Sequence, residues 1–505
     1  MHSQFDVIVV GGGGSGLAAA VSAAEHGSSV LLLEKQPRLG GTTGIAVGSF
    51  TANGTTLQTK ADIHDSLEAH AEDAGRFAPD EIEARNNAGL RRFFLSHTAE
   101  TLDWLSGMGL SFYGPSPEPP NRVPRMHNVV PAAKAYIAAL QARLLELGGE
   151  IRCNAAVTKL LQPTDRVEGV EAAIKGRKVV SFAARRGVVL AAGDYANSPE
   201  IIAEMKGREF SEIEGINPNA TGDGHLLAQS AGAQLLNMDV AYGPELRFVP
   251  PQGGTFHQLL PASGPLARLM GKAMRFTPKF VINALIKRLL VTWQHPENSL
   301  FDDGAILVNP EGRRFCNEKE WPSREIALAK QTGKAAYILL DRRLIDLYSK
   351  WPNFISTAPK IAYAYVRDYL KLRPDIAAES ALMDVVAEKR GLPSEAMTET
   401  VHEFNRYVKG LARDPFGRTG DKEELKGNRW VLLGPAKAWF TTTEGGAAID
   451  ESLRVLDDGG LPLPGLYAVG QNGLGGQILW GHGLHIGWAL TSGRLVGKIL
   501  GGAAE

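Results

Sequence analysis

Residues 7–16 read Val-Ile-Val-Val-Gly-Gly-Gly-Gly-Ser-Gly, an apolar run that ends in a cluster of glycines. The run predicts a short strand, and the small residues over about 15–26 predict a helix directly after it. A second apolar run at 30–33 predicts the next strand. The segment therefore predicts a strand, helix, strand unit with a glycine-rich turn between its first two elements.

The spacing of the glycines indicates what this turn binds. Gly11, Gly13 and Gly16 satisfy the pattern G-x-G-x-x-G. Glycines allow a tight turn and let the backbone N–H groups at a helix N-terminus approach a pyrophosphate. Glu34 ends the second strand, where a carboxylate can accept a hydrogen bond from a ribose hydroxyl. The combination predicts a dinucleotide site, and we expect the Lys35 ammonium beside it to be solvated.

Composition excludes several other classes of protein. The 505 residues contain 54 Lys and Arg against 55 Asp and Glu, so no electrostatic footprint for a nucleic-acid partner exists. The two cysteines, Cys153 and Cys316, have no metal-ligand spacing, so neither a disulfide framework nor a metal site is expected. The N-terminus enters a strand at once and resembles no signal peptide, so a cytoplasmic location is expected.

A change in composition predicts a second domain. Aromatic residues, prolines and helical periodicity increase between residues 243 and 433. We predict an inserted domain over 243–433, inside a discontinuous first domain formed by 1–242 and 434–505. The proline-rich segment 113–124 predicts an ordered loop, and a closing helix is expected from Gly487.

A resemblance to one flavoprotein superfamily indicates the cofactor. Glu34-Lys35 followed by Gly-Gly-Thr-Thr-Gly at 40–44 resembles the flavin-contacting loop of the fumarate reductase and 3-ketosteroid dehydrogenase flavoproteins. Further stretches match that superfamily in the same order along the chain: 189–193, 221–233, 312–318 and 465–470. The resemblance implies FAD. No histidine lies in the 40–50 loop, where relatives with covalent flavin carry theirs, so a non-covalent cofactor is implied.

The same resemblance implies the architecture and the cofactor contacts. The fold class is α/β, with a Rossmann-like FAD-binding domain of the glutathione reductase type and an inserted α+β substrate domain as its cap. FAD contacts are implied for the glycine-rich turn, the following loop and three later segments, namely Gly11, Gly13, Gly14, Ser15, Gly16, Glu34, Lys35, Gly40, Gly41, Thr42, Thr43, Ala156, Val157, Ala192, Gly193, Gly470, Gln471 and Leu484.

Two missing arginines indicate the branch of the superfamily. Fumarate reductases carry one arginine in an Arg-Gly-x-Gly element and another in a C-terminal Asn-Arg-x-Gly-Gly element. Here the first position is Phe301, and residues 473–480 contain no arginine. A dicarboxylate substrate needs such cations to pair its charges. The pattern disfavours fumarate reduction and favours the ketosteroid-type desaturases.

The C-terminal tail resembles the Tyr-x-Gly-x-Gly element of those desaturases. It reads Leu-Trp-Gly-His-Gly over 479–483, with both glycines in place and Leu479 or Trp480 in place of the tyrosine. The resemblance implies that the Gly483 N–H polarises the ketone oxygen and that Trp480 and Tyr113 are walls of the substrate cavity. Loss of the tyrosine favours a small cyclic ketone over a steroid.

Desaturation beside a ketone also needs a base for the α-proton and an acceptor for the β-hydride. Tyr195 is our predicted base, because it follows Gly193-Asp194 in a turn toward the flavin, where relatives carry a phenylalanine. A phenol with a pKa of about 10 needs a nearby cation or dipole to act as a base. The alternative role is a packing aromatic, and Tyr113, His482 and His485 are the next candidates.

We therefore predict an FAD-dependent dehydrogenase that introduces a C=C bond α,β to the carbonyl of a cyclic ketone of cyclohexanone or 3-ketosteroid type. The alternative is the opposite reaction, an enone or enoate reductase of fumarate type. A third hypothesis is a membrane-associated binding module, because segment 265–293 interleaves basic with apolar residues. We favour a flap over the active site for that segment, with weak membrane contact as the other interpretation. The sequence does not specify the electron acceptor.

Overall fold

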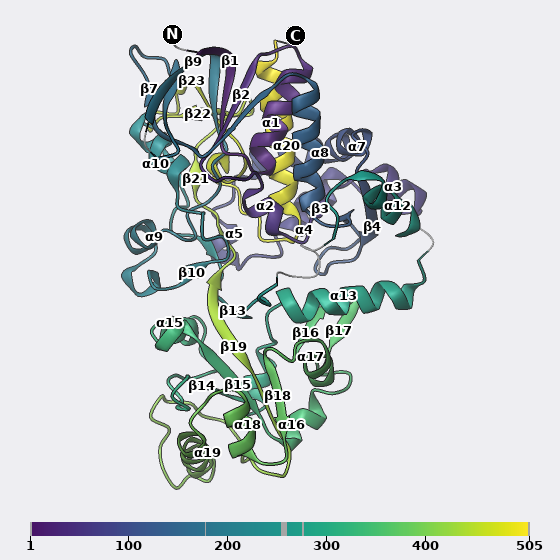
Figure 1. The fold of residues 1–505 in the computed structure, drawn as a ribbon, viewed down its shortest axis with the longest axis vertical. Coiled ribbons are helices and arrows are strands. Elements are labelled where there is room, and N and C mark those ends of the chain that lie inside the picture. Colours follow the sequence, from purple (N-terminus) through teal and green to yellow (C-terminus); the bar gives the residue numbers. More distant parts are fainter. Residues whose placement is uncertain (1–2, 177, 254–259, 275–276, 503–505) are drawn as a thin grey trace.

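The computed structural model describes residues 3–176, 178–253, 260–274 and 277–502. It contains two large sheets, each with its own hydrophobic core. Figure 1 shows the two units along the long axis of the molecule, with both ends of the chain in the same unit. The mixture of parallel sheet and covering helices confirms the predicted α/β class.

The first sheet has eight strands around β1 (Ser3–Val10), the apolar run that precedes the glycine-rich turn. β1 pairs in parallel with β2 (Val30–Glu34) and with β9 (Lys178–Leu190). Its last four residues are at most 5% exposed, as expected for a parallel sheet covered on both faces. The other strands are β6 (Glu150–Cys153), β7 (Ala155–Leu161), β8 (Gly169–Ile174), β22 (Arg454–Leu456) and β23 (Pro462–Ala468).

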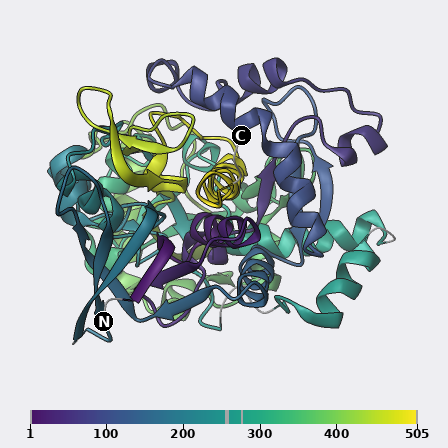
Figure 2. The same cartoon turned by 90° about the horizontal axis from the view of Figure 1, so that it is seen from above.

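Helix α1 (Gly14–Glu25) packs along the closing helix α20 (Leu484–Leu500), and Figure 2 shows the two nearly end-on and side by side. A β-carbon on Gly493 would lie 2.3 Å from the carbonyl oxygen of Ser15. The helices can approach this closely only because such positions lack a side chain. α20 begins at Leu484, earlier than the predicted start at Gly487, so Gly483 is its N-cap.

The rest of the first unit consists of short helices and a small sheet. The three-stranded sheet contains β3 (Ser49–Thr51), β4 (Ser111–Ser116) and β5 (Met126–Val130), so the first part of the proline-rich segment is an edge strand. The helices are α2 (Gly41–Ile45), α3 (Thr56–Lys60), α4 (Leu67–Ala74), α5 (Asp80–Glu83), α6 (Ala88–Ser96), α7 (Thr98–Gly107), α8 (Lys134–Glu146) and α10 (Asp223–Ser230).

The second unit is built on strand β19 (Trp430–Phe440), which pairs with four other strands. The sheet contains β10 (Glu214–Gly215), β13 (Glu245–Phe248), β14 (Ile306–Val308), β15 (Ala336–Leu340) and β18 (Ala377–Ser380). Its helices are α9 (Pro199–Met205), α14 (Ser299–Asp302), α15 (Ser323–Ala329), α16 (Arg342–Leu347), α17 (Val366–Leu372), α18 (Met383–Lys389) and α19 (Ser394–Val408).

The predicted boundaries at 242/243 and 433/434 need correction. Residue 434 lies inside β19, which remains in the second sheet as far as Phe440. Tyr195 and Ile201 already belong to the second hydrophobic core. Two short antiparallel pairings join distant parts of the chain between the units. β11 (Leu235–Leu236) pairs with β21 (Gly446–Ala447), and β12 (Ala241–Tyr242) pairs with β20 (Thr442–Thr443).

Helix α12 (Gly264–Met274) packs on β4 and β5 of the first unit, and Figure 1 shows the next helix, α13 (Lys279–Trp293), crossing between the units. α13 packs on the hairpin of β16 (Ser356–Ala358) and β17 (Ala362–Ala364). The side chains of Arg268, Lys272, Arg275 and Lys279, part of the basic segment, lie outside the described residues. No helix in the described ranges is long and apolar enough to cross a membrane.

The α1–α20 contact predicts the effect of one added methyl group. Gly493→Ala should lower the free energy of unfolding by ~1–3 kcal/mol, because overpacking forces the helices apart. Thermal or urea unfolding measures this change. Gly107→Ala is the control, since its methyl group meets nothing within 4 Å and an exposed helix terminus tolerates alanine. An unchanged unfolding curve for Gly493→Ala would contradict the close packing.

Candidate active site

The glycines of the turn are of two kinds. Some leave no room for a β-carbon because other parts of the chain pack against them, and one faces open space. A β-carbon on Gly11 would lie 2.3 Å from the Ala191 carbonyl oxygen, and one on Gly16 would lie 1.9 Å from the Gly11 carbonyl oxygen. A β-carbon on Gly13 would meet nothing closer than the Gly40 carbonyl oxygen at 3.9 Å. The space at Gly13 therefore fits a bound pyrophosphate at the N-terminus of α1.

Glu34 supports this turn directly. Its carboxylate is 8% exposed and accepts hydrogen bonds from the N–H groups of Gly12 and Gln36, each at 2.7 Å. Its contact with a ribose hydroxyl stays a prediction. Lys35 corrects an expectation: its ammonium is not solvated but binds Asp223 at 2.8 Å and Thr221 at 2.6 Å. The turn is thus held by backbone hydrogen bonds to a buried carboxylate, and the residue after β2 by an ion pair.

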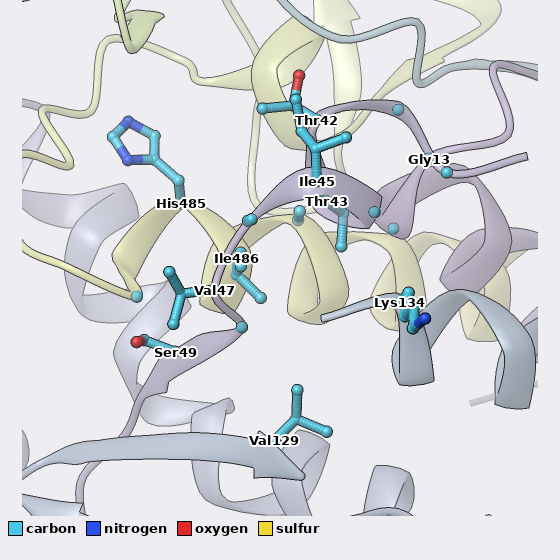
Figure 3. A pocket seen from close by; sticks show the side chains of 18 of the residues that line it. Gly13, Thr42, Thr43, Ile45, Val47, Ser49, Val129, Lys134, His485 and Ile486 are labelled. Carbon is cyan, nitrogen blue, oxygen red and sulfur yellow. The ribbon is translucent and has the colours of Figure 1, made fainter. Parts of the chain in front are cut away.

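A cavity of about 1250 Å³ joins the glycine-rich turn to the second unit. Figure 3 shows Gly13, Thr42 and Thr43 near His485 and Ile486 of α20, so both ends of the chain meet around it. The sequence-predicted residues that line it are Gly11, Gly13, Gly14, Ser15, Glu34, Lys35, Gly40, Gly41, Thr42, Thr43, Tyr113, Ala192, Gly193, Gln471, Trp480 and Gly483.

Several predicted cofactor contacts lie elsewhere. Ala156 and Val157 pair with β8 and are not among the lining residues. Leu484 is 2% exposed and packs into the first core, whereas its neighbours His485 and Ile486 line the cavity. Gly16 and Gly470 serve close packing, since a β-carbon on Gly470 would lie 2.7 Å from the Ser15 hydroxyl.

Tyr195 is not placed to act as the base. Its side chain is fully buried, its hydroxyl donates to the Met238 carbonyl oxygen at 2.6 Å, and it does not line the cavity. Burial raises the pKa of this phenol far above its ordinary value, and the nearby carboxylates of Asp194 and Asp239 add to the increase. Tyr195 is therefore a packing aromatic, the alternative role that the sequence left open.

The charged groups that line the substrate side of the cavity are paired. His482 Nδ1 lies 2.5 Å from Glu118 Oε1, and His485 Nε2 lies 2.8 Å from Glu444 Oε1. The two histidines flank Gly483, and the sequence had marked both as secondary candidates. Glu118 was missed because nothing in the sequence places the proline-rich segment beside the C-terminal tail.

Arg247 is a second residue that sequence reasoning missed. Its guanidinium lines the cavity, is 8% exposed as a residue, and donates to Glu245 Oε2 at 2.5 Å and to Thr441 at 3.3 Å. Burial acts to raise the pKa of Glu245, but the charges of Arg247 and His295 and the hydrogen bonds from Arg247 and Thr441 together outweigh burial and hold the pKa at about 2. Arg247 therefore lines the cavity as part of an ion pair with Glu245, and the pair has no net charge.

Two arginines of the second unit, Arg313 and Arg324, do not line the cavity. Phe301, at the position of the fumarate reductase arginine, is buried in the second core beneath the guanidinium of Arg324, which lies 4.8 Å from the ring centre. Arg324 binds Glu325, and Arg313 binds Glu399 at the surface. Neither arginine is among the lining residues, and the preference against fumarate stays a prediction.

These features, a dinucleotide-binding sheet with a cavity that extends from its glycine-rich turn under a second unit, define an FAD-dependent oxidoreductase. The family model described as "FAD binding domain" matches residues 6–477, and the chain belongs to that family. It is similar in sequence to fumarate reductases and shares the fold of 3-ketosteroid dehydrogenases.

Curated relatives are similar over nearly the whole chain. A fumarate reductase (cytochrome) of Shewanella frigidimarina is 26% identical over 98% of this chain and 77% of its own length. A vinyl phenol reductase of Lactiplantibacillus plantarum is 27% identical over 98% of this chain and 96% of its own.

Solved structures share the fold. The open conformation of a flavocytochrome c3 fumarate reductase has a TM-score of 0.72 at 24% identity, covering 99% of this chain and 78% of that one. A 3-ketosteroid delta1-dehydrogenase from Sterolibacterium denitrificans has a TM-score of 0.64 at 18% identity, covering 99% of this chain and 100% of that one.

The open space at Gly13 predicts a variant that loses FAD without losing its fold. In Gly13→Val the new β-carbon meets no close protein atom, so the fold should be kept. The valine side chain would occupy the position expected for the pyrophosphate. We expect an intact circular dichroism spectrum and a colourless protein. Acid precipitation of the wild type should release its flavin, since no covalent attachment is expected. Full retention of FAD by Gly13→Val would place the pyrophosphate elsewhere.

Proposed function

We propose that the protein oxidises an apolar cyclic ketone to the α,β-unsaturated ketone, with FAD as the two-electron acceptor. The observation that carries the proposal is the Gly483 N–H at the beginning of α20, on the cavity wall. In the described part of the chain this N–H donates to no protein acceptor. A backbone donor in this position suits a carbonyl oxygen on which negative charge develops.

The walls around Gly483 support an apolar substrate. α13 contributes Ile282, Leu285, Ile286, Leu289 and Leu290 to the cavity, as expected for a flap over the site. Trp480 and Tyr242 contribute aromatic walls, and their ring centres are 5.4 Å apart in an edge-to-face arrangement. Such surfaces favour a ring of carbon atoms with one polar end.

The charges of the cavity disfavour a carboxylate substrate. Arg247 is compensated by Glu245, and the histidines near Gly483 each contact a carboxylate. A carboxylate on the substrate would add negative charge near Glu118 and Glu444, whose histidine partners are already engaged. A neutral ketone avoids that repulsion, so the ion pairs support the same class of substrate as the apolar walls.

We infer that the Trp480 indole N–H is a second donor to the carbonyl oxygen, beside the Gly483 N–H. The Gly483 N–H lies at the positive end of the α20 helix dipole, which stabilises an enolate oxygen. The indole N–H of Trp480 is buried and has no hydrogen-bond partner among the described residues. A buried donor without a partner costs about 1–3 kcal/mol, a cost that a substrate oxygen can remove. Trp480 thus takes the role of the missing tyrosine in our proposal.

Reduction of an activated alkene is the second candidate. Curated relatives similar to this chain include reductases named for fumarate, vinyl phenol and urocanate. Polarisation of a carbonyl by Gly483 accelerates the reaction in both directions, because both share one transition state. The natural electron acceptor or donor decides the physiological direction.

A paired assay tests substrate class and direction. We expect the enzyme to reduce an artificial dye with saturated cyclic ketones such as cyclohexanone, and to use fumarate poorly as an electron acceptor because its two charges find no pair of cations. Steady-state rates with a dye acceptor and with a dye donor plus cyclohexenone measure both directions. Fast fumarate turnover without ketone oxidation would reject the proposal.

Trp480→Phe tests the second donor, since it keeps an aromatic wall and removes the indole N–H. Loss of one donor to a developing oxyanion should lower kcat by ~10²–10³. FAD content and thermal stability should stay unchanged. Trp351→Phe is the control, because Trp351 is 62% exposed and outside the cavity lining. Equal kcat values for wild type and Trp480→Phe would remove Trp480 from the site.

A further inference from the structure

Two histidine–glutamate pairs flank Gly483, and they differ in which ring nitrogen they use. His485 bonds Glu444 through Nε2, its outer nitrogen. His482 bonds Glu118 through Nδ1, the nitrogen next to the backbone. The Nε2 of His482 has no hydrogen-bond partner among the described residues. His482 is therefore the one of the two histidines whose outer nitrogen is available to accept a proton.

Glu118 is held so that it fixes the orientation of this imidazole. Its side chain is 7% exposed, and its Oε1 accepts from both the backbone N–H and the Nδ1 of His482, at 2.9 and 2.5 Å. The backbone bond anchors the same oxygen that binds the ring. The carboxylate therefore selects the ring orientation with Nε2 pointing away from Glu118.

The accessible surface of His482 faces the cavity. The side chain is 57% accessible, yet burial acts to lower its pKa, and the residue lines the cavity together with Gly483. The imidazole thus adjoins the position of the ketone whose oxygen meets the Gly483 N–H.

We propose that His482 Nε2 is the base that takes the α-proton of the ketone, and that Glu118 is its positioning residue. This inference rests on the proposed function. His482 replaces Tyr195 in that role, and its place beside the carbonyl donor puts base and donor on the same short segment of chain. Because α20 starts directly after this segment, both groups keep their mutual geometry.

The chemical step conserves protons and electrons. The α C–H bond breaks as an N–H bond forms at Nε2, and the electron pair of the C–H bond becomes part of an enolate whose oxygen accepts from the Gly483 N–H. FAD, held at the glycine-rich turn, would supply the two-electron acceptor for the β-hydride, so that the C=C bond could form. The imidazolium next to Glu118 then loses its proton to water.

The charges around His482 set the direction of its pKa. Burial lowers the pKa, but the hydrogen bond and charge of Glu118, with a contribution from Glu245, outweigh burial and raise it above 6.5. Arg247, which is paired with Glu245, acts to lower the pKa of His482. His295 is close enough for the charges of His482 and Arg247 to lower its own pKa. A raised pKa means that the neutral base accumulates only above it, so turnover rises with pH through that pKa.

The test separates proton transfer from oxidation. The holoenzyme, without an electron acceptor, is incubated with cyclohexanone deuterated at both α-carbons, and NMR follows the loss of deuterium to water. Oxidation with a dye acceptor is measured in parallel against pH. We expect His482→Gln to lower both rates by ~10²–10⁴, the range for a positioned general base. His64→Gln, in an exposed histidine–aspartate contact outside the cavity, should leave both rates unchanged.

Glu118→Gln tests the positioning role. Loss of the carboxylate charge should lower the pKa of His482, so the ascending limb of the pH profile should move to lower pH while the plateau falls. Histidine 15N NMR of the same variant, with or without FAD, should show the same downward shift of the His482 titration. A merely structural role for Glu118 would leave both titrations in place.

The outcomes distinguish the two proposals. If His482→Gln keeps wild-type exchange and the same ascending limb, the base proposal is overturned and ketone oxidation stands. If His482 titrates identically in wild type and Glu118→Gln, the positioning role is overturned. If the wild type neither exchanges α-deuterium nor oxidises any cyclic ketone, the proposed function fails and the base fails with it.

Discussion

The close contact between α1 and α20 joins the two ends of the chain, and the geometry of the cavity depends on it. Gly493 lets α20 approach the backbone of α1 near Ser15, so the N-cap of α20 lies over the same cavity as the glycine-rich turn. Two helix N-termini thereby face one space. One suits a pyrophosphate, and the other suits the oxygen of a ketone.

Charge compensation is the second constraint on this cavity. Lys35 binds Asp223, Arg247 binds Glu245, and both histidines near Gly483 bind carboxylates. Burying a single charge without a partner is far more costly than burying a pair. The pairing lowers the cost of burying these groups, and it favours recognition through hydrogen bonds and apolar contact.

The two units are interleaved rather than joined by a simple linker. β19 begins in the second sheet and leads directly through β20 and β21 to the cavity, while β13 supplies Arg247 to the cavity from the second unit. α13 covers the substrate side with its apolar face. A movement of the second unit therefore changes the substrate side, whereas the contacts of the glycine-rich turn with Ala191 and Gly40 lie within the first unit.

The glycine-rich turn and the α/β class follow from local sequence pattern, whereas FAD and the role of Gly483 are implied by the resemblance to a flavoprotein superfamily. A turn that needs glycines at fixed spacing, or a strand that needs a continuous apolar run, can be predicted from neighbouring residues. Tertiary structure alone decided that Tyr195 points into the second core and that Leu484 packs in the first. It also decided that Glu118 meets His482 and that Arg247 enters the cavity. These contacts join segments hundreds of residues apart, and their side-chain directions depend on the packing of both units, which no local pattern records.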